Sequence, residues 1–334
     1  MSAPHEQGGA VFNGRRGFFW VGSERESGPA GTVPRGRMYV EWLAPLEVTK
    51  PYPIVLVHGG GGQGTDYLGT PDGRPGWAPM LVEEGYAVYV VDRPGHGRSP
   101  LDPAVLGEIG PSFPYEAMPM IFLPQPGSHP TAELHSQWPG SGDLESDEAV
   151  DQFISGTGPM LRDFPAAQAL EGTRIAELLD RTGPVILLAN SAGGPSGFLA
   201  ADARPGLVKA LIEVETIGPP FADLPPLGVT LSYGLTAAPI GFDPPVGDPA
   251  ELDGKPRALP NLQGFPIAIA SGEASPFIHF DDQIVDFLKA AGCDAERVRL
   301  ADHGVHGNGH GMMLERNNRE TLGVLLDWID RRVS

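Results

Sequence analysis

VILLANSAGGPSG, residues 185–197, decides the fold of this 334-residue chain. Four apolar residues run directly into a short segment of small residues centred on Ser191. A buried strand that ends in this way is typical of a sharp strand–turn–helix bend that holds up a nucleophile, whose usual pattern is Gly-x-Ser-x-Gly. Alanine replaces the first glycine here, which keeps that position small. The alternative is an ordinary strand-to-loop junction that contains a serine, and it does not explain the small neighbours.

The segments around this stretch alternate between strand-like and helix-like patterns. Short apolar, β-branched runs indicate strands at 18–21, 38–45, 53–59, 86–92, 185–190, 207–215, 266–272 and 298–302. Apolar residues at helical spacing indicate helices at 77–85, 166–183, 279–292 and 318–332. Several strands are continuously apolar, as in parallel sheets covered on both faces, and the first two resemble an antiparallel pair. We therefore predict an α/β fold in one domain, 1–334, with a doubly wound, mostly parallel sheet of about eight strands.

Two stretches, 100–165 and 217–264, interrupt this alternation. Connections longer than about 15 residues without regular structure are usually lids or binding loops. We predict that both are insertions that form a cap over the active site, because neither has the apolar periodicity of a separate domain. The apolar segments 118–124 and 221–235, with Trp138, are candidates to line a pocket beneath the cap.

Composition excludes several classes of function. The formal net charge of −19 would repel phosphate backbones and anionic membranes, so we expect neither nucleic-acid nor membrane binding. No apolar run reaches the roughly 20 residues needed to span a bilayer. The single cysteine, Cys293, cannot form an intrachain disulfide, and we expect it to be semi-exposed.

The sequence also bears on location and assembly. The first 20 residues lack the pattern of a secretory signal, so we expect a soluble protein, cytoplasmic by default, with an exported mature form left open. The apolar content of the insertions permits a homodimer without requiring one.

A glycine run, HGGGGQG at 58–64, directly follows the apolar strand that begins at residue 53. Glycines let the backbone approach a reacting carbonyl and direct N–H groups at its oxygen, as an oxyanion hole requires. We expect the donors to be Gly60 or Gly61, together with the N–H of Ala192. The phosphate-binding pattern G-x-x-x-x-G-K-[ST] does not occur here.

A serine nucleophile needs a base, and the segment 304–317, GVHGNGHGMMLERN, offers candidates near the carboxyl end of the last strand. His303, His306 and His310 compete for this role. We favour His310, since the histidine loop of enzymes with a serine–acid–histidine chain order often ends in Gly-His followed five positions later by an acidic residue, here Glu315. His306 is the alternative base, and it could instead form hydrogen bonds within the loop.

The acid that orients this histidine is open between two positions. Glu215 ends the strand 207–215, where a charge after an apolar run requires a partner. Glu273 ends the following strand, where most enzymes with a serine–acid–histidine chain order carry the acid. Asp281 and Asp282 are expected to be solvated residues at the start of a helix.

With these motifs, the chain from about Phe18 onward resembles the α/β-hydrolases, and within them a small group of bacterial serine esterases. The resemblance is densest at LVHGGGGQG, TPDGRPGW (70–77), GYAVYVVDRPGHGRS (85–99), NSAGG, VET and GVHGNGHGMMLERNN. In that group the acid is a glutamate one strand earlier than usual. The resemblance thus implies a triad of Ser191, His310 and Glu215, while GHGRS is a structural turn. The alanine in the serine motif and the run of four glycines depart from the group.

Two hypotheses about function remain. The first is a serine hydrolase that cleaves a small-molecule carboxylic ester or lactone through an acyl-enzyme, with no metal or organic cofactor. We expect the substrate to carry a medium-sized, largely apolar acyl or alcohol group, and an amidase or thioesterase would use the same triad. The second is a binding or regulatory protein that keeps the fold without turnover. The presence of nucleophile, base, acid and oxyanion glycines together favours the enzyme.

Overall fold

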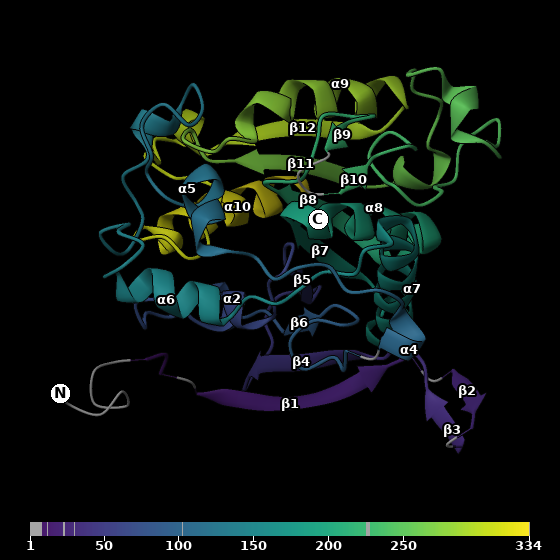
Figure 1. Cartoon of the computed structure of the whole chain (residues 1–334), viewed down its shortest axis with the longest axis horizontal. Coiled ribbons are helices and arrows are strands. Elements are labelled where there is room, and N and C mark those ends of the chain that lie inside the picture. Colours follow the sequence, from purple (N-terminus) through teal and green to yellow (C-terminus); the bar gives the residue numbers. More distant parts are fainter. Residues whose placement is uncertain are drawn as a thin grey trace.

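A computed structural model describes residues 9–333 apart from positions 12, 23, 30, 102 and 225–227. Its largest element is an eight-stranded sheet with the order β1-β4-β6-β5-β7-β8-β11-β12, which Figure 1 shows from the bottom of the view to the top. The strands are β1 (Gly14–Val21), β4 (Met38–Pro45), β5 (Ile54–Val57), β6 (Val88–Asp92), β7 (Val185–Asn190), β8 (Val208–Val214), β11 (Pro266–Ser271) and β12 (Asp294–Arg299).

The pairing in the sheet follows the prediction. β1 pairs antiparallel with β4, and β4 pairs antiparallel with β6. The remaining strands, from β6 through β5, β7, β8 and β11 to β12, pair in parallel. The predicted α/β fold with a mostly parallel sheet is therefore confirmed. Because parallel strands share a direction, the carboxyl ends of β5, β7, β8 and β11 meet at one edge.

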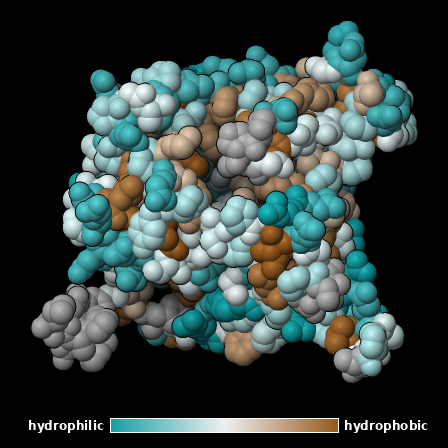
Figure 2. All heavy atoms as spheres, viewed as in Figure 1, coloured by the Kyte–Doolittle hydropathy of each residue, from teal (hydrophilic) through white to brown (hydrophobic). Residues whose placement is uncertain are grey.

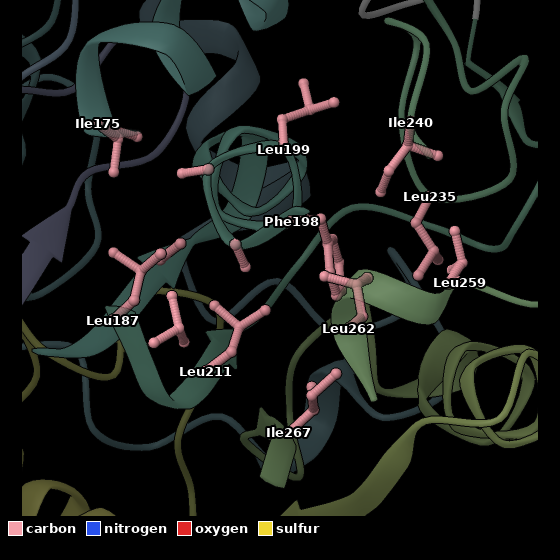
Figure 3. Packing of buried hydrophobic residues seen from close by; sticks show 14 of the residues in the cluster. Ile175, Leu187, Phe198, Leu199, Leu211, Leu235, Ile240, Leu259, Leu262 and Ile267 are labelled. Carbon is pink, nitrogen blue, oxygen red and sulfur yellow. The ribbon is translucent and has the colours of Figure 1, made fainter. Parts of the chain in front are cut away.

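Helices cover both faces of the sheet. Alternate residues of β7 enter different hydrophobic clusters, Leu187 on one face and Leu188 on the other, because side chains alternate along a strand. Buried side chains of α7 (Phe164–Thr182), α8 (Gly194–Ala203) and α9 (Asp281–Ala290) belong to the first cluster, and those of α3 (Trp77–Glu83) and α10 (Asn318–Arg332) to the second. Figure 3 shows Phe198 of α8 among the leucines and isoleucines of the first cluster.

Three details of the sequence prediction are wrong. The last strand is 294–299, not 298–302, and Leu300–His303 forms a 3-10 turn. This strand lies at the sheet edge, where charged side chains alternate with buried ones and break the apolar run. Cys293 is buried in the core, where burial raises the pKa of its thiol to about 11. Asp281 is also buried, and it accepts a hydrogen bond from the Ser271 hydroxyl at 2.5 Å.

The first of the two long stretches has short helices, α4 (Pro103–Leu106), α5 (Met118–Ile121) and α6 (Glu148–Ser155). It also has a small hydrophobic cluster of its own, which includes Met118, Leu123 and Trp138. The indole N–H of Trp138 donates to Asp147, so this side chain packs inside the stretch and does not line a pocket.

The second long stretch packs on the main core. It holds two short strands, β9 (Asp223–Leu224) and β10 (Val229–Thr230), which pair antiparallel. Leu235, Leu259 and Leu262 are buried in the same cluster as α8, as Figure 3 shows. Most of the described part of 221–235 is therefore occupied in packing. Leu231 and Leu235 of this candidate segment are buried and line neither cavity near Ser191.

Outside the main sheet, β2 (Arg25–Gly28) and β3 (Gly31–Pro34) form an antiparallel hairpin that the sequence pattern did not indicate. The face of the molecule in Figure 2 is largely hydrophilic, with hydrophobic residues in separate groups. Within the described ranges, no helix is long and apolar enough to cross a membrane.

Candidate active site

Ser191 lies in the sharp bend that the sequence predicts. It follows β7 directly, and its φ of 51° is in the left-handed region, a strained conformation for a residue with a side chain. A Cβ at position 193 would lie 2.4 Å from the carbonyl oxygen of His58, so only glycine fits there. A 3-10 turn (Ser191–Gly193) then leads into α8. The bend explains the small neighbours, and it leaves Ser191 half-buried.

The structure brings Ser191, His310 and Glu215 together in one hydrogen-bonded chain. The Nε2 atom of His310 lies 3.0 Å from the Ser191 hydroxyl, and its Nδ1 atom lies 3.3 Å from Oε2 of Glu215. The glutamate follows β8 with a φ of 54°, which turns its side chain along the edge of the sheet toward the histidine. These three residues come from separate strand ends, as the sequence analysis expects.

Other groups hold the Glu215 carboxylate in place. Its Oε1 atom accepts the backbone N–H of Gly272 at 2.7 Å, and its Oε2 atom accepts the hydroxyl of Ser275. Hydrogen bonds of this kind stabilise a buried carboxylate and fix its orientation. Ser275 was not a candidate at the sequence level, since a serine four residues after a strand has no distinctive pattern.

Aromatic rings enclose the histidine. Phe122 and Phe277 meet the His310 ring edge-on, with centroid distances of 5.3 and 4.5 Å. Phe122 belongs to the segment 118–124, which the sequence analysis places near the substrate, whereas Phe277 was missed. Both rings limit the access of water to the hydrogen bond between His310 and Glu215.

The alternative acid and the alternative base pair with each other. The Nδ1 atom of His306 lies 3.1 Å from Oε2 of Glu273, and Oε1 of this glutamate accepts the backbone N–H of Gly307 at 2.6 Å. The His306 side chain is 63% exposed. Neither residue has a hydrogen bond to Ser191 among the described contacts. His303 is also exposed.

Glu315 fastens the loop that carries His310. Its carboxylate accepts the Gly309 N–H at 2.9 Å and the Asn308 side-chain amide at 2.7 Å, and it lies 2.7 Å from Nε2 of His135. His135 comes from the first long stretch, so this contact ties that stretch to the loop. The sequence analysis used Glu315 only as a spacing marker for His310.

The glycine loop lies against Ser191 and Ala192. A Cβ at Gly60 would approach the Cβ of Ala192 to 3.2 Å and the sulfur of Met160 to 2.9 Å. Gly61 has a φ of 65°, and its carbonyl accepts the Gly158 N–H at 2.7 Å. Among the described hydrogen bonds, the N–H groups of Gly60 and Gly61 have no acceptor. They are available to a ligand atom beside the serine.

A buried network holds the start of this loop. His58 Nε2 accepts the backbone N–H of Arg93 at 2.9 Å, so the proton is on Nδ1, which donates to the Gly59 carbonyl at 2.9 Å. The Arg93 guanidinium also donates to this carbonyl and pairs with Glu171. Burial and the nearby Arg93 charge hold the pKa of His58 well below its usual value. The histidine is therefore neutral, and the loop is fixed by charge-assisted hydrogen bonds.

Two cavities lie near the serine, and the smaller one includes it. A cavity of about 510 Å³ lies beside Gly60 and Gly61 and is mostly apolar; it is lined among others by Phe113, Met120, Ile121, Met160, Leu161 and Phe164. A cavity of about 40 Å³ contains Ser191 and His310, with Asp66, Phe122, Phe153, Met313 and Leu314 around them. Of the segment 221–235, Gly228 is the described residue that reaches the larger cavity.

A further glutamate, Glu213, lies beneath the start of α8. A Cβ at Gly194 would lie 2.3 Å from its Oε2 atom, and neither carboxyl oxygen has a hydrogen-bond partner among the described residues. Burial raises the pKa of Glu213 well above its usual value. Across the described ranges, no group of three or more His, Cys, Asp or Glu side chains is placed to hold a metal ion.

Comparison with known proteins shows the family of this chain. The model of the α/β hydrolase fold family matches residues 52–227, more than half of the chain. A "probable secreted lipase phiG" of Fungal sp. (strain ATCC 74256) is 35% identical over 335 residues, covering 94% of this chain and 89% of the relative. The solved structure of a novel bacterial esterase has a TM-score of 0.68 and 24% identity, covers 98% of both chains and supports the fold alone. Because the fungal relative is named as secreted, a cytoplasmic location stays an untested expectation.

Proposed function

The chain belongs to the α/β-hydrolase fold family and is a carboxylic ester hydrolase, and we propose that it works through an acyl-enzyme formed on Ser191. The observation that carries this mechanism is the hydrogen-bonded chain from Ser191 through His310 to Glu215, with distances of 3.0 and 3.3 Å. A serine hydroxyl is a weak nucleophile until a neighbouring base removes its proton.

In the first half-reaction, the Ser191 hydroxyl attacks the ester carbonyl and His310 Nε2 takes its proton. The same nitrogen then gives this proton to the departing alcohol, which leaves the acyl group on the serine. In the second half-reaction a water molecule attacks the acyl-enzyme, and His310 Nε2 takes its proton. Return of this proton to the Ser191 oxygen releases the carboxylic acid. Glu215 keeps the proton of the imidazole on Nδ1 and stabilises the imidazolium that forms, since both side chains are at most 3% exposed.

The negative charge that develops on the carbonyl oxygen needs donors that are already in place. The N–H groups of Gly60 or Gly61 and of Ala192 are suited to this role, because the glycine loop lies against Ala192 and its carbonyl at Gly59 is held by His58 and Arg93. One such donor contributes roughly 10²- to 10³-fold to the rate.

We extend the proposal to the two stretches 100–165 and 217–264, which act as a cap over the site within a single domain. Support comes from Phe122, which packs on the His310 ring, and from the cavity wall formed by Met120 and Ile121. A cap of this kind excludes water from the hydrogen bonds of the triad and binds an apolar substrate.

Hydrolysis of ethyl butyrate, followed by titration of the released acid, tests this mechanism. We expect turnover by the parent protein, background rates for Ser191→Ala, and parent rates for Ser27→Ala on the exposed β2–β3 hairpin. A fluorophosphonate probe should label the parent on Ser191 and leave Ser191→Ala unlabelled. An inactive parent with no label on Ser191 would contradict the mechanism, and turnover of thioesters or amides but not of esters would change the class of bond.

A further inference from the structure

The two cavities near Ser191 differ in size and in chemistry. The larger, which we call the Met160 cavity, has about 510 Å³ and is walled by side chains such as Ile121, Met160 and Phe164. The smaller, which we call the His310 cavity, has about 40 Å³ and includes Ser191, His310 and Asp66. Gly60 lines both cavities, so both adjoin the glycine loop. An ester bound at Ser191 therefore has one roomy apolar side and one narrow, partly polar side.

The chemistry of ester cleavage decides which part of the substrate enters which cavity. In the mechanism proposed above, His310 Nε2 delivers its proton to the oxygen of the leaving alcohol. That oxygen has to lie within hydrogen-bond reach of His310, which belongs to the smaller cavity. The acyl chain departs from the carbonyl carbon in the other direction. It is therefore directed past Gly60 and Gly61 into the Met160 cavity, whose volume is in the range of small-molecule sites.

Asp66 gives the alcohol side a polar wall. A Cβ at position 62 would lie 2.3 Å from Asp66 Oδ2, so the glycine at that position makes room for this carboxyl group. The Oδ2 atom accepts the Gln63 N–H at 3.2 Å, while no described donor contacts Oδ1. Burial raises the pKa of Asp66 to about 7. A carboxyl group that is neutral for part of the time suits a hydroxyl partner better than a cation.

The alcohol side also opens outward. Asp66, Phe153 and Leu314 border a second hollow of about 450 Å³, lined in addition by Thr65, Thr70 and Gln152. Its wall carries hydroxyl, amide and carboxyl groups, in contrast to the apolar wall around Met160. A hydroxylated alcohol can therefore continue from His310 past Asp66 toward polar partners.

We propose, on the basis of the proposed function, that the substrates are esters of a medium-length apolar acid with a small hydroxylated alcohol. The acyl chain occupies the Met160 cavity, and a free hydroxyl group of the alcohol forms a hydrogen bond with Asp66. Asp66 is thus a specificity-determining residue for the alcohol. Gly62, the last of the four consecutive glycines, leaves room for its carboxyl group.

Two isomeric esters test the direction of binding. Methyl nonanoate and octyl acetate have the same composition, so their overall apolarity is similar, but the long chain lies on the acid in one and on the alcohol in the other. We expect kcat/KM to be at least about tenfold higher for methyl nonanoate, a difference of about 1.4 kcal/mol. Equal values or a preference for octyl acetate overturn the direction. If Ser191-dependent cleavage of ethyl butyrate persists in that case, the proposed function stands and only this inference fails.

A bulky side chain in the cavity wall tests where the acyl chain lies. In Ile121→Trp, the ratio of kcat/KM for methyl nonanoate to that for methyl propionate should fall at least tenfold, since the tryptophan fills the Met160 cavity. Leu134→Trp is the matched control, because Leu134 is exposed in the same long stretch and does not line the cavity. An unchanged ratio in a folded Ile121→Trp protein that a fluorophosphonate still labels places the acyl chain elsewhere.

The role of Asp66 is tested by the preference between two octanoate esters. We expect the parent to favour 1-monooctanoylglycerol over methyl octanoate by about tenfold in kcat/KM, as for one hydrogen bond to a charged or polar group. Asp66→Leu should bring this ratio close to one, and Asp66→Asn should retain part of it. Asp151→Leu, on the exposed face of α6, is the control. The same ratio in the parent and in Asp66→Leu would overturn the assignment of Asp66.

Discussion

Two glutamate–histidine pairs lie at the same edge of the sheet, and they differ in burial. Glu215 and His310 are 0% and 3% exposed and meet at 3.3 Å, whereas Glu273 and His306 are 20% and 63% exposed and meet at 3.1 Å. The glutamates follow neighbouring strands, β8 and β11, and the histidines are four positions apart in one loop. Pair distance alone does not separate a catalytic pair from a surface ion pair.

Surroundings separate the two pairs. The carboxylate of Glu215 also binds Gly272 and Ser275, and the ring of His310 is enclosed by Phe122 and Phe277. In such a low-dielectric environment a hydrogen bond is stronger, and the imidazole keeps one orientation. Water competes for both partners of the exposed pair, so it contributes at most about 1 kcal/mol. Burial and contact with Ser191 together make the first pair suitable for catalysis.

The largest expected effect is at the histidines. His310→Ala should lower kcat for ethyl butyrate by about 10⁴-fold or more, because the serine then lacks its base. His306→Ala is the matched control and should stay within about twofold of the parent. Steady-state rates of both variants, with fluorophosphonate labelling to report on Ser191, make the comparison. A strong loss in His306→Ala would reverse the assignment of the base.

The next effect is at the glutamates. Glu215→Gln should reduce kcat by about 10²- to 10⁴-fold, since the amide cannot stabilise the imidazolium and favours the wrong tautomer of His310. Glu273→Gln should remain close to the parent. The same ester assay, run over a range of pH, measures both. Comparable losses in the two variants would mean that the exposed pair supports catalysis as well.

Glu213 sharpens the comparison, because it is buried without a histidine or any other described hydrogen-bond partner. Its raised pKa means that the folded protein keeps this proton above pH 4.5, while the unfolded chain loses it. The free energy of unfolding therefore falls as pH rises above that value, by up to about 1.4 kcal/mol per pH unit. In Glu213→Gln, which stays neutral, this contribution is removed. Urea unfolding at pH 5, 6.5 and 8 should show a stability difference between variant and parent that grows with pH; a constant difference would contradict it.

The smallest effect concerns the stability that the exposed pair provides. Glu273→Gln should change the free energy of unfolding by no more than about 1 kcal/mol, because His306 is mostly in solvent. His306→Gln should give a similarly small change. Urea unfolding of the two single variants and the double variant measures the pair energy directly. A coupling well above 1 kcal/mol would show that exposure does not weaken this pair.

Much of the fold was predictable from local patterns. The strands of the sheet interior are apolar because both of their faces are buried. The residues around Ser191 are small because the serine has a left-handed φ in a sharp bend. The sequence analysis misplaced the edge strand β12, because charged residues on its exposed side interrupt the apolar run. Cys293 was expected to be semi-exposed and Asp281 to be solvated, yet both are buried, since neighbours distant in sequence cover them.

The sequence by itself determined that this chain forms an α/β-hydrolase fold with a serine at a sharp bend and with candidate acids and bases after the strands. Only the tertiary structure decided which candidates meet. Glu215 and His310 are 95 positions apart, and their contact depends on two loops that leave the same edge of the sheet. The roles of Phe277, Ser275 and Asp66 were likewise undetermined, because each depends on residues distant in sequence. Phe277 packs on the His310 ring, Ser275 donates to Glu215, and Asp66 lines the cavity that holds Ser191.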